Sequence, residues 1–173
     1  MNGTPNQPTE TRTHTMITTP KKNPKTQGAT ALLRADHKKV ADLFADYEAA
    51  RSPAKKKKLV AQICIELSVH AQVEEEIFYP AVKRALKDKK LVPEAMVEQA
   101  TLKDLIAQVE FIEPDGEMYD AKIKVLSEYV KHHVKEEQNE MFPKAVATRL
   151  DMAALGAELS ARKAELMAQR QVP

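Results

Sequence analysis

The chain has no tryptophan, four glycines and a single cysteine among its 173 residues. One cysteine, Cys64, excludes an internal disulfide and disfavours a zinc or iron–sulfur site built from thiolates. It lies in the apolar stretch VAQICIELSV, where a free cysteine normally behaves as a small buried hydrophobe. The formal net charge is only +2, which gives no reason to expect nucleic acid or an anionic membrane surface as a partner.

Long apolar runs are also missing. No stretch approaches the length of a membrane span, and the first residues lack the apolar core of a signal peptide. We therefore expect a soluble, cytoplasmic protein. Residues 1–28 are rich in Thr, Pro, Asn, Gln and Lys. Such a segment buries too little surface to offset the entropy that ordering costs, so we expect a disordered N-terminal tail over 1–28.

From residue 29 onward, apolar side chains recur every three or four positions, as in amphipathic helices. Pro80 and Pro143 are expected to kink or break two of these helices. Short turns join the helices and no strand pattern competes. The sequence therefore predicts an all-α fold, an up-down-up-down antiparallel four-helix bundle over residues 29–150. The expected helices run over about 29–50, 53–78, from 93 to a turn at 113–116, and from that turn to about 149.

The end of the chain, residues 151–173, contains a further helical pattern over 151–169. It is amphipathic, with small and apolar side chains along one face. We expect a C-terminal helix that packs on the outside of the bundle or mediates association into a homodimer.

Histidine and glutamate interrupt the apolar faces of two helices. His70 and Glu74 replace hydrophobes at consecutive core positions of the second helix, and His133 and Glu137 do the same on the fourth. Residues four apart point the same way from a helix, so each pair can present an imidazole and a carboxylate to one point. On the first helix, His37 occupies a core position of its own.

The two pairs belong to an internal repeat. The segments HAQVEEEIFYP, from His70, and HVKEEQNEMFP, from His133, both have glutamate at the fourth following position, a second glutamate next to it, and proline at the tenth. Corresponding positions of the two copies are 63 residues apart. A repeat at this spacing predicts two helix–turn–helix halves that face each other across the bundle.

A buried carboxylate is unfavourable unless it is paired or bound to a metal ion. The His–Glu pairs are compatible with a polar core network without metal, but five such donors converging on one core favour a metal site. Mixed imidazole and carboxylate donors without thiolate suit iron, and less well manganese, particularly a pair of ions bridged by carboxylates.

At these residues the chain resembles hemerythrin-like proteins of the His-His-Glu cation-binding family. The resemblance spans roughly residues 30–147 and rests on Asp36-His37 and on the two repeated segments, from His70 to Pro80 and from His133 to Pro143. It implies a four-helix bundle with two iron ions. It also implies that three histidines are terminal ligands and two glutamates bridge the ions: His37, His70 and His133, with Glu74 and Glu137.

The third helix departs from the family pattern. Where the resemblance implies a histidine ligand, the segment VEQATLKDLI offers Gln99, whose amide oxygen is a weak neutral donor. Three outcomes are open: Gln99 coordinates weakly, Glu98 substitutes for it, or one iron keeps an open position. The last would leave one of the two ions weakly held.

Residues beside these candidates are expected to play smaller parts. His132 points about 100° away from His133, which predicts a solvated side chain or one that supports the ligands. Tyr129, one turn before His133, is expected to be an aromatic residue at the rim of the core.

Several functions fit this pattern. The first is a non-heme di-iron protein that binds or senses dioxygen or a related small ligand such as nitric oxide. The second is a di-iron enzyme that decomposes peroxide or activates oxygen. The third is a metal-depleted bundle with a structural or interaction role. Iron storage is disfavoured because nothing in the sequence suggests a cage-forming surface.

Overall fold

The computed structural model describes residues 1, 28–87, 89–110, 112–114 and 116–170. All regular structure in these residues is helical, so the predicted all-α fold is confirmed. The predicted disorder of residues 1–28 concerns a segment of which only the first and last residues are described. The elements are α1 (Ala29–Ala49), α2 (Pro53–Val73), η1 (Glu74–Phe78), α3 (Tyr79–Ala85), α4 (Leu91–Glu110), α5 (Glu117–Glu136), η2 (Glu137–Met141), α6 (Phe142–Val146) and α7 (Met152–Arg170).

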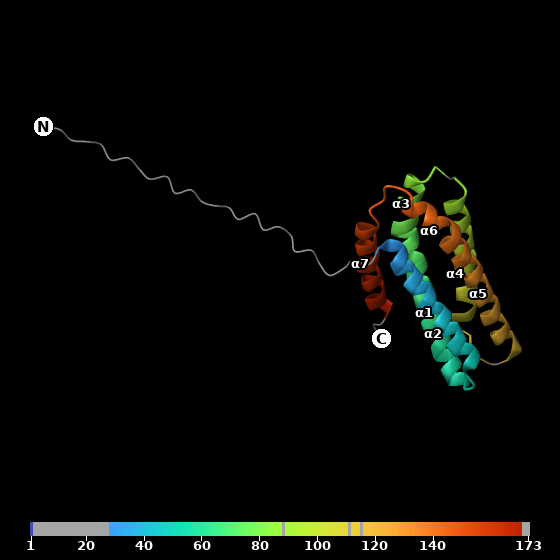
Figure 1. Ribbon diagram of the computed structural model, residues 1–173. Coiled ribbons are helices and arrows are strands. Elements are labelled where there is room, and N and C mark those ends of the chain that lie inside the picture. Colours follow the sequence, from blue (N-terminus) through green and yellow to red (C-terminus); the bar gives the residue numbers. More distant parts are fainter. Residues whose placement is uncertain (2–27, 88, 111, 115, 171–173) are drawn as a thin grey trace.

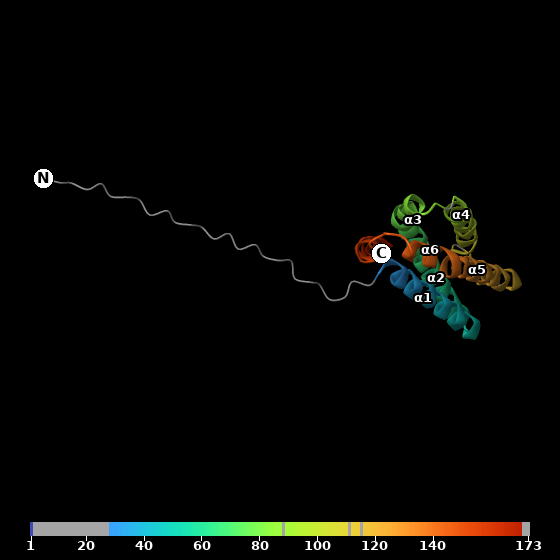
Figure 2. The same cartoon turned by 45° about the horizontal axis from the view of Figure 1, so that its top comes forward.

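Four long helical segments run antiparallel and form the bundle (Figure 1). α1 packs along α2, α4 packs along α5, and contacts of α2 with α4 and of α1 with α5 close the bundle. A fifth helix, α7, packs on α1 and α2 and lies on the side away from α4 and α5 (Figure 2). The expectation that α7 packs on the outside of the bundle is confirmed, whereas association through α7 stays a prediction.

The two prolines at the ends of the repeated segments do not stop their helices. A proline nitrogen has no hydrogen to donate to the carbonyl four residues back. Ahead of Pro80, Tyr79 N–H instead bonds the carbonyl of Glu74, five residues back, and ahead of Pro143, Phe142 N–H bonds that of Glu137. The wide turns η1 and η2 therefore absorb the prolines, and the helices continue as α3 and α6.

The apolar core consists of two clusters, one at each end of the bundle. The cluster at the end nearer α3 and α6 includes Phe78, Phe142 and buried leucines of α7. The other includes Phe44, Ile63 and Cys64. Cys64 is buried as predicted, and burial raises the pKa of its thiol to about 12.

The polar residues of the repeat lie between these two clusters. Each helical segment that carries candidate ligands runs from one apolar cluster to the other, and the ligands lie in between. On α1, for example, Leu33 belongs to one cluster and Val40 to the other, and His37 lies between them. None of the helices in the described residues is long and apolar enough to cross a membrane.

Candidate metal centre

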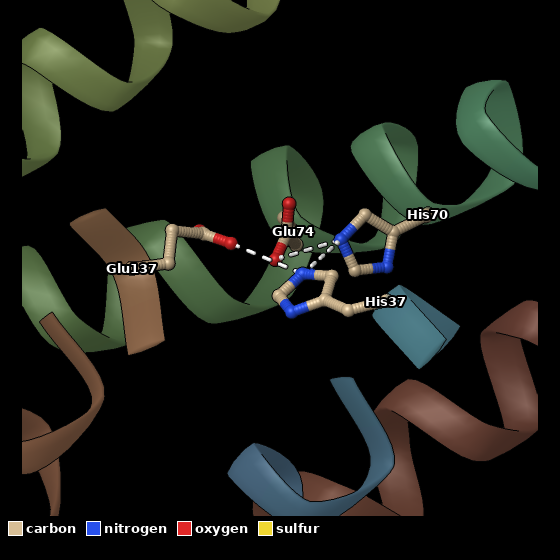
Figure 3. A group of neighbouring side chains, drawn as sticks. All are labelled: His37, His70, Glu74 and Glu137. Atoms are coloured by element: carbon tan, nitrogen blue, oxygen red, sulfur yellow. Dashed lines mark hydrogen bonds and ion pairs between the residues drawn. The ribbon is translucent and has the colours of Figure 1, made fainter. Parts of the chain in front are cut away.

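Four buried side chains converge in the middle of the bundle (Figure 3). They are His37 from α1, His70 from α2, Glu74 at the start of η1 and Glu137 at the start of η2, and their donor atoms all lie within 4.8 Å of one another. The Nε2 atoms of His37 and His70 are 3.0 Å apart. Glu137 Oε2 lies 3.3 Å from His37 Nε2, and Glu74 Oε1 lies 3.3 Å from His70 Nε2. We call these four residues the first half of the centre.

The second half of the centre contains His133, Gln99 and Tyr79. The Tyr79 hydroxyl donates to Glu137 Oε1 at 2.8 Å and accepts a hydrogen bond from Gln99 Nε2 at 3.0 Å. It also lies 3.3 Å from Glu74 Oε2 and 3.4 Å from His133 Nε2. The hydroxyl therefore occupies the point toward which the donors of this half converge.

Tyr79 was not among the residues predicted for the centre. In the repeat it corresponds to Phe142, since each residue directly precedes the proline of its segment. Phe142 stacks on the imidazole of His37, with ring centroids 5.8 Å apart and an angle of 4° between the planes. One copy of the repeat thus places an apolar ring at the centre and the other places a phenol there. That difference between the two aligned copies was the available signal.

Carboxylates and an amide face the outer nitrogens of the three imidazoles. Asp36 Oδ2 lies 3.6 Å from His70 Nδ1, Glu98 Oε2 lies 2.7 Å from His133 Nδ1, and the side-chain amide of Gln138 lies 2.9 Å from His37 Nδ1. Such partners fix the orientation of a ligand imidazole and raise its basicity. Glu98 therefore contacts the back of His133, and it does not converge with the four donors of the first half.

Gln99 is 1% exposed and lies where the sequence placed it, at the centre. Its side-chain amide donates to Glu74 Oε2 at 2.6 Å. The outer oxygens of both central carboxylates are thus engaged, Glu74 Oε2 by Gln99 and Glu137 Oε1 by Tyr79. Gln99 acts in this arrangement as a hydrogen-bond donor to a carboxylate.

The inner oxygens of the same carboxylates lack such donors. Glu74 Oε1 and Glu137 Oε2 are buried and accept no hydrogen bond from the described part of the chain. A buried carboxylate oxygen without a partner is strongly unfavourable. Both atoms face the imidazole nitrogens of the first half. Two imidazoles and two carboxylates form a donor set that suits a transition-metal cation such as iron or manganese. The residues of the first half therefore fit a metal ion.

The pKa values of His70 and Glu137 show that the first half also stabilises positive charge. Burial by itself lowers the pKa of His70, but the charge of Glu74 and the nearby carboxylate of Asp36 raise it to about 10. Burial raises the pKa of Glu137, but the imidazole of His37, 3.3 Å away, and the charge of His133 hold it at about 2. In metal-free protein near neutral pH, a proton on His70 thus supplies positive charge among ionised carboxylates.

Comparison with known proteins identifies the family. The model of the hemerythrin HHE cation-binding domain matches residues 28–145. The chain belongs to the hemerythrin HHE cation-binding family. This confirms the resemblance that the repeated segments carried, over nearly the same residues. Helix α7 lies beyond the matched hemerythrin domain.

Two individual proteins are similar to this chain. A hemerythrin HHE cation-binding domain protein of Mycobacterium kansasii has the same fold, with a TM-score of 0.72 at 20% identity, over 82% of this chain and 88% of that one. A DNA nickase of Nostoc sp. is 32% identical over 111 residues. That match covers 64% of this chain and 31% of the nickase, so the chain spans about a third of the length of that relative.

A small cavity adjoins the candidate centre. Its volume is about 20 Å³, and His37, His70, Gln99 and His133 are among the residues that line it. This is enough space for about one water-sized molecule. The apolar lining comes from all four helices of the bundle: Val40, Leu67, Ala71, Leu102, Ile106, Val130 and Val134.

Two residues near His133 lie at the surface. His132 is exposed, as predicted, and its Nε2 lies 3.2 Å from Glu136 and 3.5 Å from Glu98. Tyr129 is 38% exposed, and its place at the rim of the core stays a prediction.

Proposed function

We propose that this chain is a non-heme iron protein in which the first half of the centre holds one iron ion tightly. His37, His70, Glu74 and Glu137 would be its ligands. The observation that carries the proposal is the pair of buried carboxylate oxygens without hydrogen-bond donors, both aimed at imidazole nitrogens. A cation at this point would satisfy both oxygens. Manganese suits the same donors but is the less favoured ion.

A second iron ion would be held more weakly. The residues that would hold it are His133 and the carboxylates of Glu74 and Glu137. In the structure, Tyr79 and Gln99 already donate hydrogen bonds to the outer oxygens of these carboxylates. An ion in the second half must displace both donors, and Gln99 offers only a neutral amide oxygen in return. This is the physical reason for proposing unequal occupancy.

The small ligand that we propose is dioxygen or nitric oxide. Iron supplies the redox-active ion to which such molecules bind. The chain supplies the cavity of about 20 Å³ on the side of the imidazoles, whose mostly apolar walls admit a small uncharged molecule and exclude bulk water. The Tyr79 hydroxyl, buried beside both carboxylates, can donate a hydrogen bond within the centre. We propose that the protein acts in the reducing cytoplasm, where a free thiol such as that of Cys64 stays reduced.

Peroxide decomposition is the second candidate function. The observation that favours it is the buried Tyr79 hydroxyl, 2.8 Å from Glu137, because a proton donor inside the centre serves peroxide chemistry as well as reversible binding. Both functions require the same iron ligands. They differ in whether the small molecule leaves unchanged.

The test uses the full chain loaded with iron(II) without air. Reversible spectral changes on adding and removing dioxygen, or on adding nitric oxide, are expected for a binding protein, whereas sustained oxygen evolution from added peroxide would establish the enzyme. His132→Ala, which changes an exposed imidazole beside the centre, is the matched control and should behave as the parent chain. An iron-loaded chain that responds to none of the three molecules would contradict the proposal.

Gln99→His is expected to strengthen the second ion. The substitution would remove the amide that donates a hydrogen bond to Glu74 Oε2, and the new imidazole would add a strong metal ligand in the second half. We expect the iron bound per chain, measured after gel filtration, to rise from about one toward two. Gln108→His, which makes the same change at an exposed position of α4, is the control. An iron content that stays the same in both variants would show that Gln99 does not limit the second ion.

A further inference from the structure

We infer that Lys163 of α7 is a positioning residue for the metal centre, acting through Asp36 on His70. The inference rests on the proposed function, because it concerns the metal affinity of the first half. It assigns a role to a helix that lies beyond the matched hemerythrin domain.

A chain of three contacts connects α7 to the centre. The Lys163 ammonium donates to Asp36 Oδ1, the other oxygen of Asp36 faces His70 Nδ1 at 3.6 Å, and His70 Nε2 points into the first half. The side chains of Lys163 and Asp36 are 22% and 10% exposed. Solvent therefore screens this ion pair much less than it screens a pair on the open surface.

Apolar packing fixes α7 in the place from which Lys163 reaches Asp36. Leu155, Leu159 and Leu166 of α7 are buried in the same apolar cluster as residues of α1 and α2. This cluster borders the centre on the side of Phe142, whose ring stacks on His37. A helix seated in this way presents Lys163 in one fixed position.

The neighbouring residue makes a different contact. Arg162 donates to both carboxylate oxygens of Glu76 in η1, at 2.7 and 3.1 Å. Its side chain is 31% exposed and that of Glu76 is 39% exposed, and Glu76 contacts no residue of the first half among the interactions described for it. Arg162 thus anchors the same helix with the same charge, but it is not connected to a candidate ligand. It is a matched control for Lys163.

The second half of the centre holds its imidazole differently. Glu98, the counterpart of Asp36, contacts His133 Nδ1 at 2.7 Å and also faces His132 and Glu136 at the surface. A lysine ammonium engages Asp36, whereas an exposed imidazole faces Glu98. The ion pair with Lys163 keeps Asp36 directed at His70. Without it, the Asp36 carboxylate is free to turn toward solvent, and His70 loses the partner that orients its ring.

The experiment measures Co²⁺ binding to the full chain and three variants: Lys163→Met, Arg162→Met and Leu159→Ala. A Co²⁺ titration measures the affinity of the centre for the ion, and the visible absorption of bound Co²⁺ reports the geometry of its ligands. Lys163→Met is expected to weaken Co²⁺ binding by about 10- to 100-fold, the usual effect of losing a partner behind a ligand histidine, and to change the absorption bands. Lys163→Arg should restore both. Arg162→Met should leave both within about twofold of the parent chain.

Leu159→Ala separates positioning from simple stability. Leu159 is fully buried in α7, so its truncation loosens the helix without changing any charge. Thermal unfolding of the metal-free chains measures how much stability each variant loses, so that changes in Co²⁺ binding can be compared at equal loss of stability. If Leu159→Ala or Arg162→Met weakens Co²⁺ binding as much as Lys163→Met at equal loss of stability, the inference is overturned. If Lys163→Met does not fold, Lys163→Gln repeats the comparison. Failure of the parent chain to bind Co²⁺ would instead count against the proposed function.

Discussion

Replacing His70 with alanine is expected to abolish tight binding of the first metal ion and to destabilise the metal-free protein as well. His70 is buried among Asp36, Glu74 and Glu137, and its pKa of about 10 keeps it protonated near neutral pH. Alanine removes both a ligand and the positive charge that compensates these carboxylates. Loss of one partner from a buried charged group typically costs about 3–5 kcal/mol of stability. Iron content and chemical denaturation measure the two effects.

His132→Ala is the control for this substitution. It removes an imidazole that is exposed and lies next to His133 in the sequence. We expect a change in stability of less than about 0.5 kcal/mol and unchanged metal content. Equal effects of the two substitutions on metal content would contradict the assignment of His70 to the centre.

Removing the metal is expected to make the stability of the protein fall as the pH rises from about 6.5 to about 10. In the folded, metal-free protein the pKa of His70 is raised to about 10 from an ordinary value near 6.5. The folded state therefore binds this proton more tightly than the unfolded state, so its contribution to stability is complete below the ordinary pKa and is lost as the pH passes through the raised one. A bound metal ion takes the place of this proton and removes the dependence.

The measurement is the melting temperature at a series of pH values, with a chelator and with iron. The difference between loaded and metal-free protein should widen as the pH rises, because metal no longer competes with the proton on His70. Glu137 acts in the opposite direction: its pKa of about 2, against 4.5, gives stability that is lost as the pH falls through the lower value. A metal-free melting temperature that stays level or rises above pH 6.5 would contradict the charge arrangement described for the centre.

The sequence predicted the bundle and most of the centre because both depend on periodic features. His70 and Glu74 share a helix face through local spacing alone, and the second copy of the segment repeats the geometry. The family resemblance pointed to Gln99, and the helical pattern put it on the buried face of its helix, where the structure has it. What the pattern left open was the chemical part that Gln99 plays, since an amide can donate or accept, and its neighbours decide which.

Other features depend on contacts between distant residues. Tyr79 lies in an apolar stripe, where an aromatic residue is normally a packing residue, and only its three-dimensional neighbours show that its hydroxyl reaches Glu137. Lys163 meets Asp36 across 127 positions of the sequence, which no local pattern indicates. The wide turns η1 and η2 follow from the prolines in hindsight. The sequence indicated an interruption there, but a helix that lacks one backbone N–H can break, kink or form a wide turn, and the sequence does not decide among these.

The most direct test of the account is a titration of the metal-free chain with iron(II), without air, that counts the tightly bound ions and identifies their ligands. We expect one tight ion per chain, whose binding is lost in His37→Ala and in Glu74→Gln but kept in His132→Ala, and a second, weaker ion that Gln99→His strengthens. Binding of less than about one ion per chain, without any rise in melting temperature, would contradict it and would leave the buried His–Glu cluster as a polar network of the core.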